Sequence, residues 1–261
     1  MSKLALVACL ASVLAACNGL PGTSDTAKSA DGTSAPAAAK PSQLDPQIKM
    51  AALQAEAQNN YLEAAQHYQS LLTRDPDNLD LALALVRNLR FAGSTPQDID
   101  ILNSLIAKHG KTPQLLTELG KSYIASDKMN LAIPILQEVT ATPGATWDAF
   151  SALGVAYDYQ NDFARAREVY TQALLLSPRN PEVLNNLALS QAQSGDLDGA
   201  IETLGQAVDQ VSASPQVRQN LALLLALRGD TAGAERLARK DLPKEMADEN
   251  SAYYQYLAGG D

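Results

Sequence analysis

A set of small and large apolar residues recurs every 34 positions along most of the chain, and this period limits the fold more than any other feature. The clearest copy runs from residue 147 to residue 180. Its recurring positions hold Phe150, Leu153, Gly154, Tyr157, Ala166, Tyr170, Ala173 and Pro178. Stepping by 34 without gaps finds similar residues in the copies before and after it. A period of this length predicts an array of small helical units, each packed on its neighbours.

The recurring positions resemble those of the tetratricopeptide repeat, and this resemblance implies two antiparallel helices in each unit. Glycine or alanine at places 8 and 20 of the period lets two helix backbones approach closely, and larger residues fill the space beside that contact. Glycine or asparagine near place 15 turns the chain, and proline near place 32 ends the second helix. Six registers start near residues 45, 79, 113, 147, 181 and 215. The second and sixth are degenerate, with Asp98 at place 20 and Asp241 at place 27.

These positions resemble the tetratricopeptide repeat (TPR). The resemblance implies an all-α, right-handed superhelical solenoid of about six helix pairs over residues 45–248. An irregular helical bundle is the alternative, but three strong consecutive copies at a fixed period favour the repeat. Residues 249–261 carry three tyrosines and Leu257, which predict a capping helix over the last pair.

The N-terminus has the layout of a secretory signal. Lys3 precedes an uncharged run over residues 4–14, which as a helix would span only about 16 Å, half of a bilayer's hydrocarbon core. The sequence "LAAC" that ends at Cys17 resembles the bacterial lipobox, which implies removal of residues 1–16 and lipidation of Cys17. The alternative is an ordinary signal peptide with an incidental cysteine.

The segment after the cysteine predicts an anchor and a tether. Asn18 stands where aspartate would retain a lipoprotein in the inner membrane, so the lipobox resemblance implies the outer membrane, with the repeats in the periplasm. Residues 18–44 are rich in Gly, Pro, Ser, Thr and Ala and cannot bury enough apolar surface to fold. Residues 17–44 are therefore expected to be a lipidated cysteine and a disordered tether.

Charge and motifs argue against catalysis and nucleic-acid binding. The net charge is −9, which repels phosphate backbones. "GKT" at residues 110–112 and "GKS" at residues 120–122 lack the upstream glycine of a phosphate-binding loop. The only cysteines are Cys9 and Cys17, and a structural role is expected for His67. We expect no catalytic residue, metal, cofactor or small-molecule substrate.

In TPR proteins, places 2, 5, 9, 12 and 13 of the first helix line a concave groove that binds protein segments. The resemblance, together with Asn and Gln residues that recur in successive repeats, gives the candidate partner-binding residues. They are Asp158, Tyr159, Asn185, Asn186, Leu189, Gln219, Asn220 and Leu223. The groove lacks the basic residues that clamp a terminal carboxylate, so a neutral or basic peptide fits better. The alternative is that these amides only bond to one another along the solenoid.

The last third of the chain has a narrower resemblance. The segments "VRQNLALLLALRGD" (residues 217–230) and "AERLARKDLP" (residues 234–243), followed by Asn250 and Tyr254, resemble the TadD-type TPR lipoproteins of tight-adherence (Flp) pilus systems. The resemblance implies an outer-membrane factor that helps the pilus secretin to assemble or localise. A rival interpretation is an envelope TPR lipoprotein that regulates a peptidoglycan synthase or hydrolase; the neighbouring genes would distinguish the two.

Overall fold

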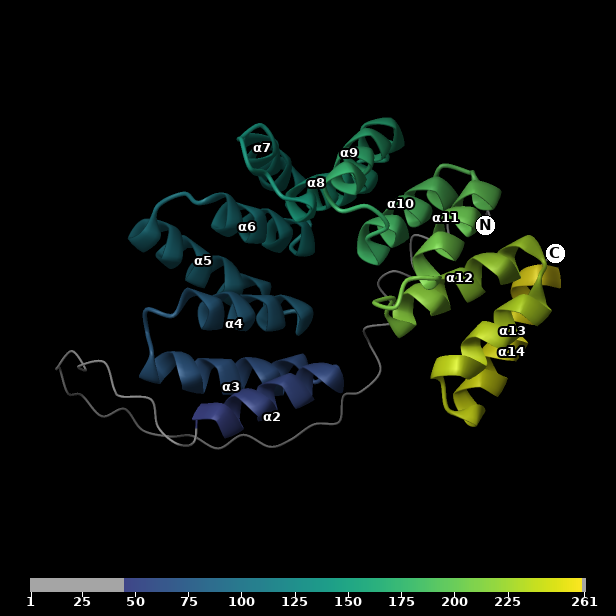
Figure 1. Ribbon diagram of the computed structural model, residues 1–261, viewed down its shortest axis with the longest axis horizontal. Helices are drawn as coiled ribbons and strands as arrows, with labels where there is room; N and C mark the ends of the chain where they lie inside the picture. Colours follow the sequence, from purple (N-terminus) through teal and green to yellow (C-terminus); the bar gives the residue numbers. More distant parts are fainter. Residues whose placement is uncertain (1–44, 260–261) are drawn as a thin grey trace. The chain divides into compact units, whose positions relative to one another are not determined.

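The computed structural model describes residues 45–259. Cys17, the signal segment and the tether therefore lie outside the described residues. Every regular element in the described range is an α-helix, and thirteen helices follow one another without a strand (Figure 1). Within residues 45–259, none of the helices combines the length and the hydrophobicity that a membrane-spanning segment requires.

The helices alternate as first and second members of six pairs, so the predicted all-α repeat fold is confirmed. The first members are α2 (Asp45–Ala57), α4 (Leu79–Phe91), α6 (Pro113–Ala125), α8 (Trp147–Tyr159), α10 (Pro181–Gln193) and α12 (Pro215–Arg228). The second members are α3 (Tyr61–Arg74), α5 (Thr95–His109), α7 (Met129–Thr140), α9 (Phe163–Leu176), α11 (Leu197–Val208) and α13 (Thr231–Asp241).

Place 16 of the period explains where most second helices begin. Asn60, Asp162, Asp196 and Asp230 all occupy this place, and each side chain accepts a hydrogen bond from the backbone N–H three residues later. Such a cap satisfies one of the free N–H groups at a helix N-terminus. The turn before it needs a left-handed residue, which is Asn161 in the fourth repeat and Gly229 in the sixth.

The described residues form two compact units, an N-terminal unit (residues 45–135) and a C-terminal unit (residues 136–259). The core of the N-terminal unit is built from alanine and leucine on consecutive helices, with Tyr68 filling the space between α2, α3 and α4. A second cluster surrounds Leu102, which is wholly buried between α4, α5 and α6. Small residues at the helix crossings allow this close packing.

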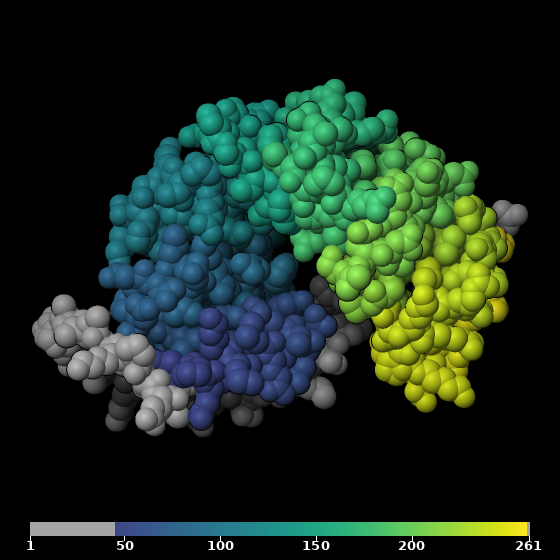
Figure 2. Space-filling model, viewed as in Figure 1, coloured from purple at the N-terminus to yellow at the C-terminus, as the bar shows by residue number. Residues whose placement is uncertain are grey.

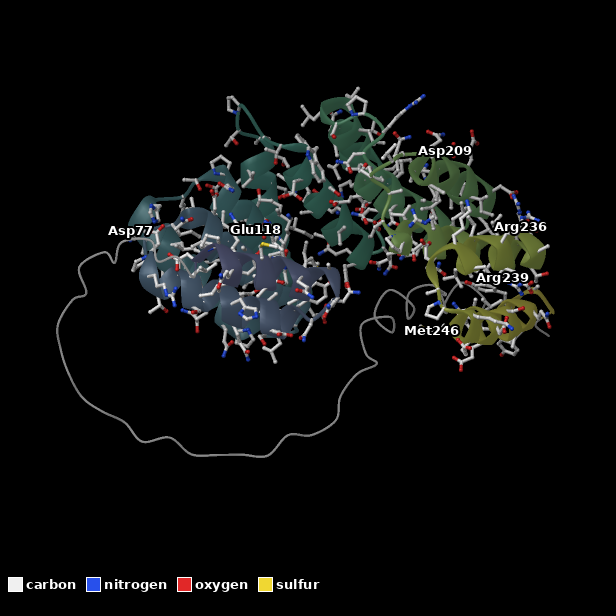
Figure 3. All side chains as sticks on the ribbon, turned by 60° about the horizontal axis from the view of Figure 1, so that its bottom comes forward. Asp77, Glu118, Asp209, Arg236, Arg239 and Met246 are labelled. Carbon is white, nitrogen blue, oxygen red and sulfur yellow. The ribbon has the colours of Figure 1, made fainter. Side chains whose placement is uncertain are left out.

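A polar network replaces part of the apolar core where the second repeat departs from the pattern. Asp98, at place 20, is fully buried and accepts a hydrogen bond from Ser122 Oγ at 2.8 Å. Arg90 forms an ion pair with Glu118 at 2.8 Å, and both side chains are almost enclosed. Glu118, labelled in Figure 3, belongs to α6. Burial raises the pKa of Asp98. Burial also acts to raise the pKa of Glu118, but Lys121 and Arg90 outweigh it and lower that pKa.

The last helix caps the C-terminal unit. It is α14 (Lys244–Gly259), which lies beside α13 in Figure 1. Its buried Tyr254 and Leu257 pack on a row of alanines from α12 and α13. The predicted start at residue 249 was wrong by five residues. Pro243 stands at place 29, earlier than the usual proline, so it ends the short α13 and lets the next helix begin at once.

Candidate functional site

The predicted partner-binding residues lie on three consecutive first helices of the C-terminal unit. Asp158 and Tyr159 end α8, Asn185 to Leu189 lie in the middle of α10, and Gln219 to Leu223 lie in α12. Helix α10 packs against both α8 and α12. The structure therefore brings the predicted residues onto adjacent elements, and we call this surface the first-helix face.

The asparagines of this face bond to one another. Asn220 Nδ2 donates to Asn185 Oδ1 at 2.7 Å, Asn185 Nδ2 donates to Asn186 Oδ1 at 3.4 Å, and Asn186 Nδ2 donates to Ser151 Oγ at 3.2 Å. Both bonds between helices join residues 35 apart, from place 6 of one repeat to place 5 of the repeat before it. This asparagine ladder links α8, α10 and α12. It matches the alternative in which these amides bond to one another along the solenoid.

The carboxylate of Asp158 is bonded within the repeat array, although its place in the repeat predicts that it faces the groove. Its two carboxylate oxygens accept hydrogen bonds from Ser190 Oγ at 2.6 Å and from Tyr170 Oη at 2.8 Å. Burial raises the pKa of Asp158 to about 6, although both hydroxyl donors favour the charged form. Burial and the nearby Asp158 carboxylate also raise the pKa of Tyr170. Asp158 thus joins α8, α9 and α10, and its carboxylate is already occupied.

The bond between Asp158 and Ser190 is one case of a recurring contact that the sequence interpretation missed. Place 12 of one repeat bonds to place 10 of the next in three copies, with partners 32 residues apart. The pairs are Glu56 with Asn88 at 2.6 Å, Arg90 with Ser122 at 3.4 Å, and Asp158 with Ser190 at 2.6 Å. The signal was present in the sequence as paired polar residues at these two places.

The remaining predicted residues differ in what they offer to a partner. Tyr159 has 60% of its surface exposed at the end of α8, and Leu189 is partly exposed, whereas Leu223 and Asn220 are buried. Gln219 is partly buried next to the ion pair between Arg218 and Asp241. The surface available to a partner therefore centres on Tyr159 and Leu189.

An ion pair fixes the end of the last repeat. Arg218 Nε and Nη2 donate to the two oxygens of Asp241 at 2.7 and 2.6 Å, and Arg218 Nη1 donates to the carbonyl of Ala213 at 3.0 Å. This bidentate geometry lowers the pKa of Asp241. Asp241, the residue that departs from the repeat pattern, thus joins α13 to α12.

The described residues provide no obvious place for a metal. Within residues 45–259, no group of three or more His, Cys, Asp or Glu side chains is arranged to hold an ion. His67 lies 3.7 Å from Glu63 on the same helix, as an i,i+4 pair on the surface.

The comparisons with known proteins agree with this architecture. Sequence profiles of the tetratricopeptide repeat match residues 47–78, 151–216 and 215–240. The matched segments carry tetratricopeptide repeats, and the six helix pairs continue the same fold through the described residues. No relative among the curated proteins matches the chain.

Several solved structures share the fold at low sequence identity. TTC0263, a thermophilic TPR protein from Thermus thermophilus, is 19% identical with a TM-score of 0.62, over 69% of this chain and 98% of that chain. PilW, described as a widely conserved type IV pilus biogenesis factor, is 14% identical with a TM-score of 0.59, over 81% of this chain and 100% of that chain. PilF of Pseudomonas aeruginosa is 16% identical with a TM-score of 0.51, over 81% of this chain and 98% of that chain.

Proposed function

We propose that the chain is an outer-membrane-anchored adaptor lipoprotein that assists the assembly or localisation of a Flp/Tad pilus secretin. The observation that carries this proposal is the likeness to PilW, a pilus biogenesis factor, which extends over 81% of this chain and all of that one. This likeness includes nearly the whole described array. The fold itself supports protein binding, because TPR arrays present extended surfaces to other proteins.

Two sequence features make the proposal more specific. The lipobox at Cys17 and the following tether suit a protein held at a membrane by lipid. The two segments that resemble TadD-type proteins form α12 and α13, and Arg218 of the first pairs with Asp241 of the second. The two segments therefore form one helix pair, in which this ion pair joins the start of α12 to the end of α13.

The first-helix face is the proposed contact for the partner. The asparagine ladder and the bonds of Asp158 fix α8, α10 and α12 relative to one another within the C-terminal unit, so the exposed groups stand on a rigid support. Exposed Tyr159 offers a large amphipathic contact, and Leu189 offers a smaller apolar one. Exposed Glu182 on α10 adds negative charge, which favours a neutral or basic segment.

Deletion of the gene tests the role. We expect fewer secretin multimers in outer-membrane fractions and loss of pili, with normal growth. Normal multimers in the deletion strain would reject the role, and an altered cell wall in their place would favour the peptidoglycan alternative.

A point variant tests the face. Tyr159→Arg places a cation where the proposed partner is neutral or basic, and should reproduce the deletion at normal protein abundance. Leu175→Arg is the matched control, because Leu175 lies on α9 and is 69% exposed. Equal assembly in both variants would move the contact away from Tyr159.

Lipidation is tested separately. Labelled palmitate should enter the wild-type protein and not Cys17→Ser, because the thiol is the proposed acyl acceptor. Equal labelling of the two proteins would show that Cys17 carries no lipid anchor. The adaptor role would then be tested by the gene deletion alone.

A further inference from the structure

The N-terminal unit carries a cleft on its second helices. The cleft lies between α3, α4 and α5 and has a volume of about 570 Å³. Its apolar lining includes Leu62, Leu85, Leu89 and Ile101, and its polar lining consists of Gln66, Gln69, Gln97 and Asp100. A volume of this size lies within the range of roughly 300–1,000 Å³ that is typical of binding pockets. The helices concerned form the purple and blue part of the surface in Figure 2.

Four exposed positions of α3 beside the cleft carry no charge. Positions 62, 66, 69 and 73 follow one another at helical spacing, and they hold Leu62, two glutamines and Thr73. All four are exposed, and Leu62 has 54% of its surface accessible. Leu62 also lines the cleft, so this strip extends the apolar lining onto the exposed side of α3.

The polar residues of the cleft indicate what could cover it. Within the described residues, the side chains of Gln66, Gln69 and Gln97 make no hydrogen bond, so each offers a free donor and a free acceptor. A peptide backbone needs both kinds of partner along its length. Asp100 is the one ionisable residue that lines the cleft, and it is exposed. The site therefore favours a cation at one point and apolar groups elsewhere.

The length of the cleft suits a short extended segment. From residue 62 to residue 69, α3 rises by about 10 Å, which corresponds to roughly three residues of extended chain. Alternate side chains of such a segment point to the same side, so apolar residues at every second position could enter the lining. We propose that this cleft binds an extended segment of a partner protein, with apolar side chains at alternate positions and a lysine or arginine opposite Asp100.

This second binding surface is separate from the first-helix face and does not depend on the proposed pilus role. Its residues come from second helices and from the buried side of α4, whereas the first-helix face belongs to α8, α10 and α12. The chain would then bind two segments, one on each unit.

A pair of labelled peptides tests the proposal by fluorescence polarisation. The first probe is a fluorescein-labelled heptapeptide of alternating leucine and threonine with one central lysine, and the second has glutamate in its place. The protein is the mature chain with Cys17→Ser, so that it carries no lipid. We expect the lysine peptide to bind about three- to five-fold more tightly, the size of an exposed charge pair. Asp100→Lys should reverse this preference.

Matched controls exist in the fourth repeat. Glu168 occupies place 22 of its repeat, as Asp100 does, and is also exposed on a second helix. Glu168→Lys should leave the preference unchanged. Gln69→Trp should fill the cleft and weaken binding about ten-fold or more, whereas Gln172→Trp on α9 should not. Circular dichroism of each variant checks that the fold is kept.

Three results would overturn the proposal. The first is no binding of the lysine peptide by the wild type at about 1 mM, the weak end of specific affinity. The second is an identical peptide preference in the wild type and Asp100→Lys. The third is self-association in sedimentation that Asp100→Lys abolishes, because it would assign the cleft to a second copy of the chain.

Discussion

Replacing Gly154 by alanine should damage the fourth helix pair through a single atom. A Cβ atom at Gly154 would lie 2.5 Å from Tyr170 Cε1, 2.6 Å from Cζ and 2.8 Å from Cδ1. The ring cannot move aside easily, because Tyr170 is fully buried and its hydroxyl is bonded to Asp158. Overpacking of this kind costs about 1–3 kcal/mol, against which the higher helix propensity of alanine returns about 1 kcal/mol. We expect a net loss of up to about 2 kcal/mol.

Gly205 provides the matched control in the same unit. It lies within α11, and a Cβ atom built there would meet nothing within 4 Å. Gly205→Ala should therefore stabilise the protein by about 0.5–1 kcal/mol through helix propensity alone. Urea unfolding of the unlipidated mature chain, followed by circular dichroism at about 222 nm, measures both changes as shifts of the unfolding midpoint. If Gly154→Ala stabilises the protein as much as Gly205→Ala, the close contact with Tyr170 does not exist.

Three further predictions concern the polar contacts of the C-terminal unit. Because folding raises the pKa of Asp158 from 3.8 to about 6, the stability of the protein should fall as the pH is raised through this interval. Asp158→Asn should weaken this pH dependence, which is measured as urea unfolding midpoints at several pH values. Arg218→Ala should cost about 1–3 kcal/mol, because it leaves the largely enclosed Asp241 without its bidentate partner, and a double-mutant cycle with Asp241→Ala should show the coupling. Asn220→Leu should cost about 1–2 kcal/mol by leaving Asn185 Oδ1 without its donor, and Asn185→Leu in the same chain should recover part of that loss in thermal unfolding.

The repeat period predicts the helix pairs well because it reports contacts between neighbours. Gly154, Tyr170 and Ala166 occupy places where size alone decides whether two helices can cross, so the residue type reveals the contact. The start of α14 is less predictable, because Pro243 shortens the preceding helix by an amount that the period does not contain. The helix therefore begins at Lys244, directly after Pro243, and not at residue 249 as the pattern predicts.

The polar surface is harder to predict, because the register gives the side of a helix and not the partner of a side chain. The register places Asp158 in the groove, but its carboxylate accepts hydrogen bonds from the hydroxyls of Tyr170 and Ser190. For Asn185 and Asn220 the sequence is compatible with partner binding and with mutual bonding, and only the distance between their side chains shows the hydrogen bond. The cleft of the N-terminal unit could not be predicted either, because it depends on how far α3 lies from α5.

Site-specific photo-crosslinking in living cells tests the proposed adaptor role most directly. A benzoylphenylalanine at position 159 replaces an exposed tyrosine on the first-helix face, and the same residue at position 175 lies on the exposed side of α9. The account predicts that irradiation crosslinks position 159 to the pilus secretin and that position 175 gives no such product. A competitor chain without the crosslinker that carries Tyr159→Arg should not reduce the yield of the crosslinked product. The account would be contradicted by equal amounts of crosslinked secretin from both positions. It would also be contradicted if position 159 gave no crosslinked secretin although deletion of the gene lowers the number of secretin multimers.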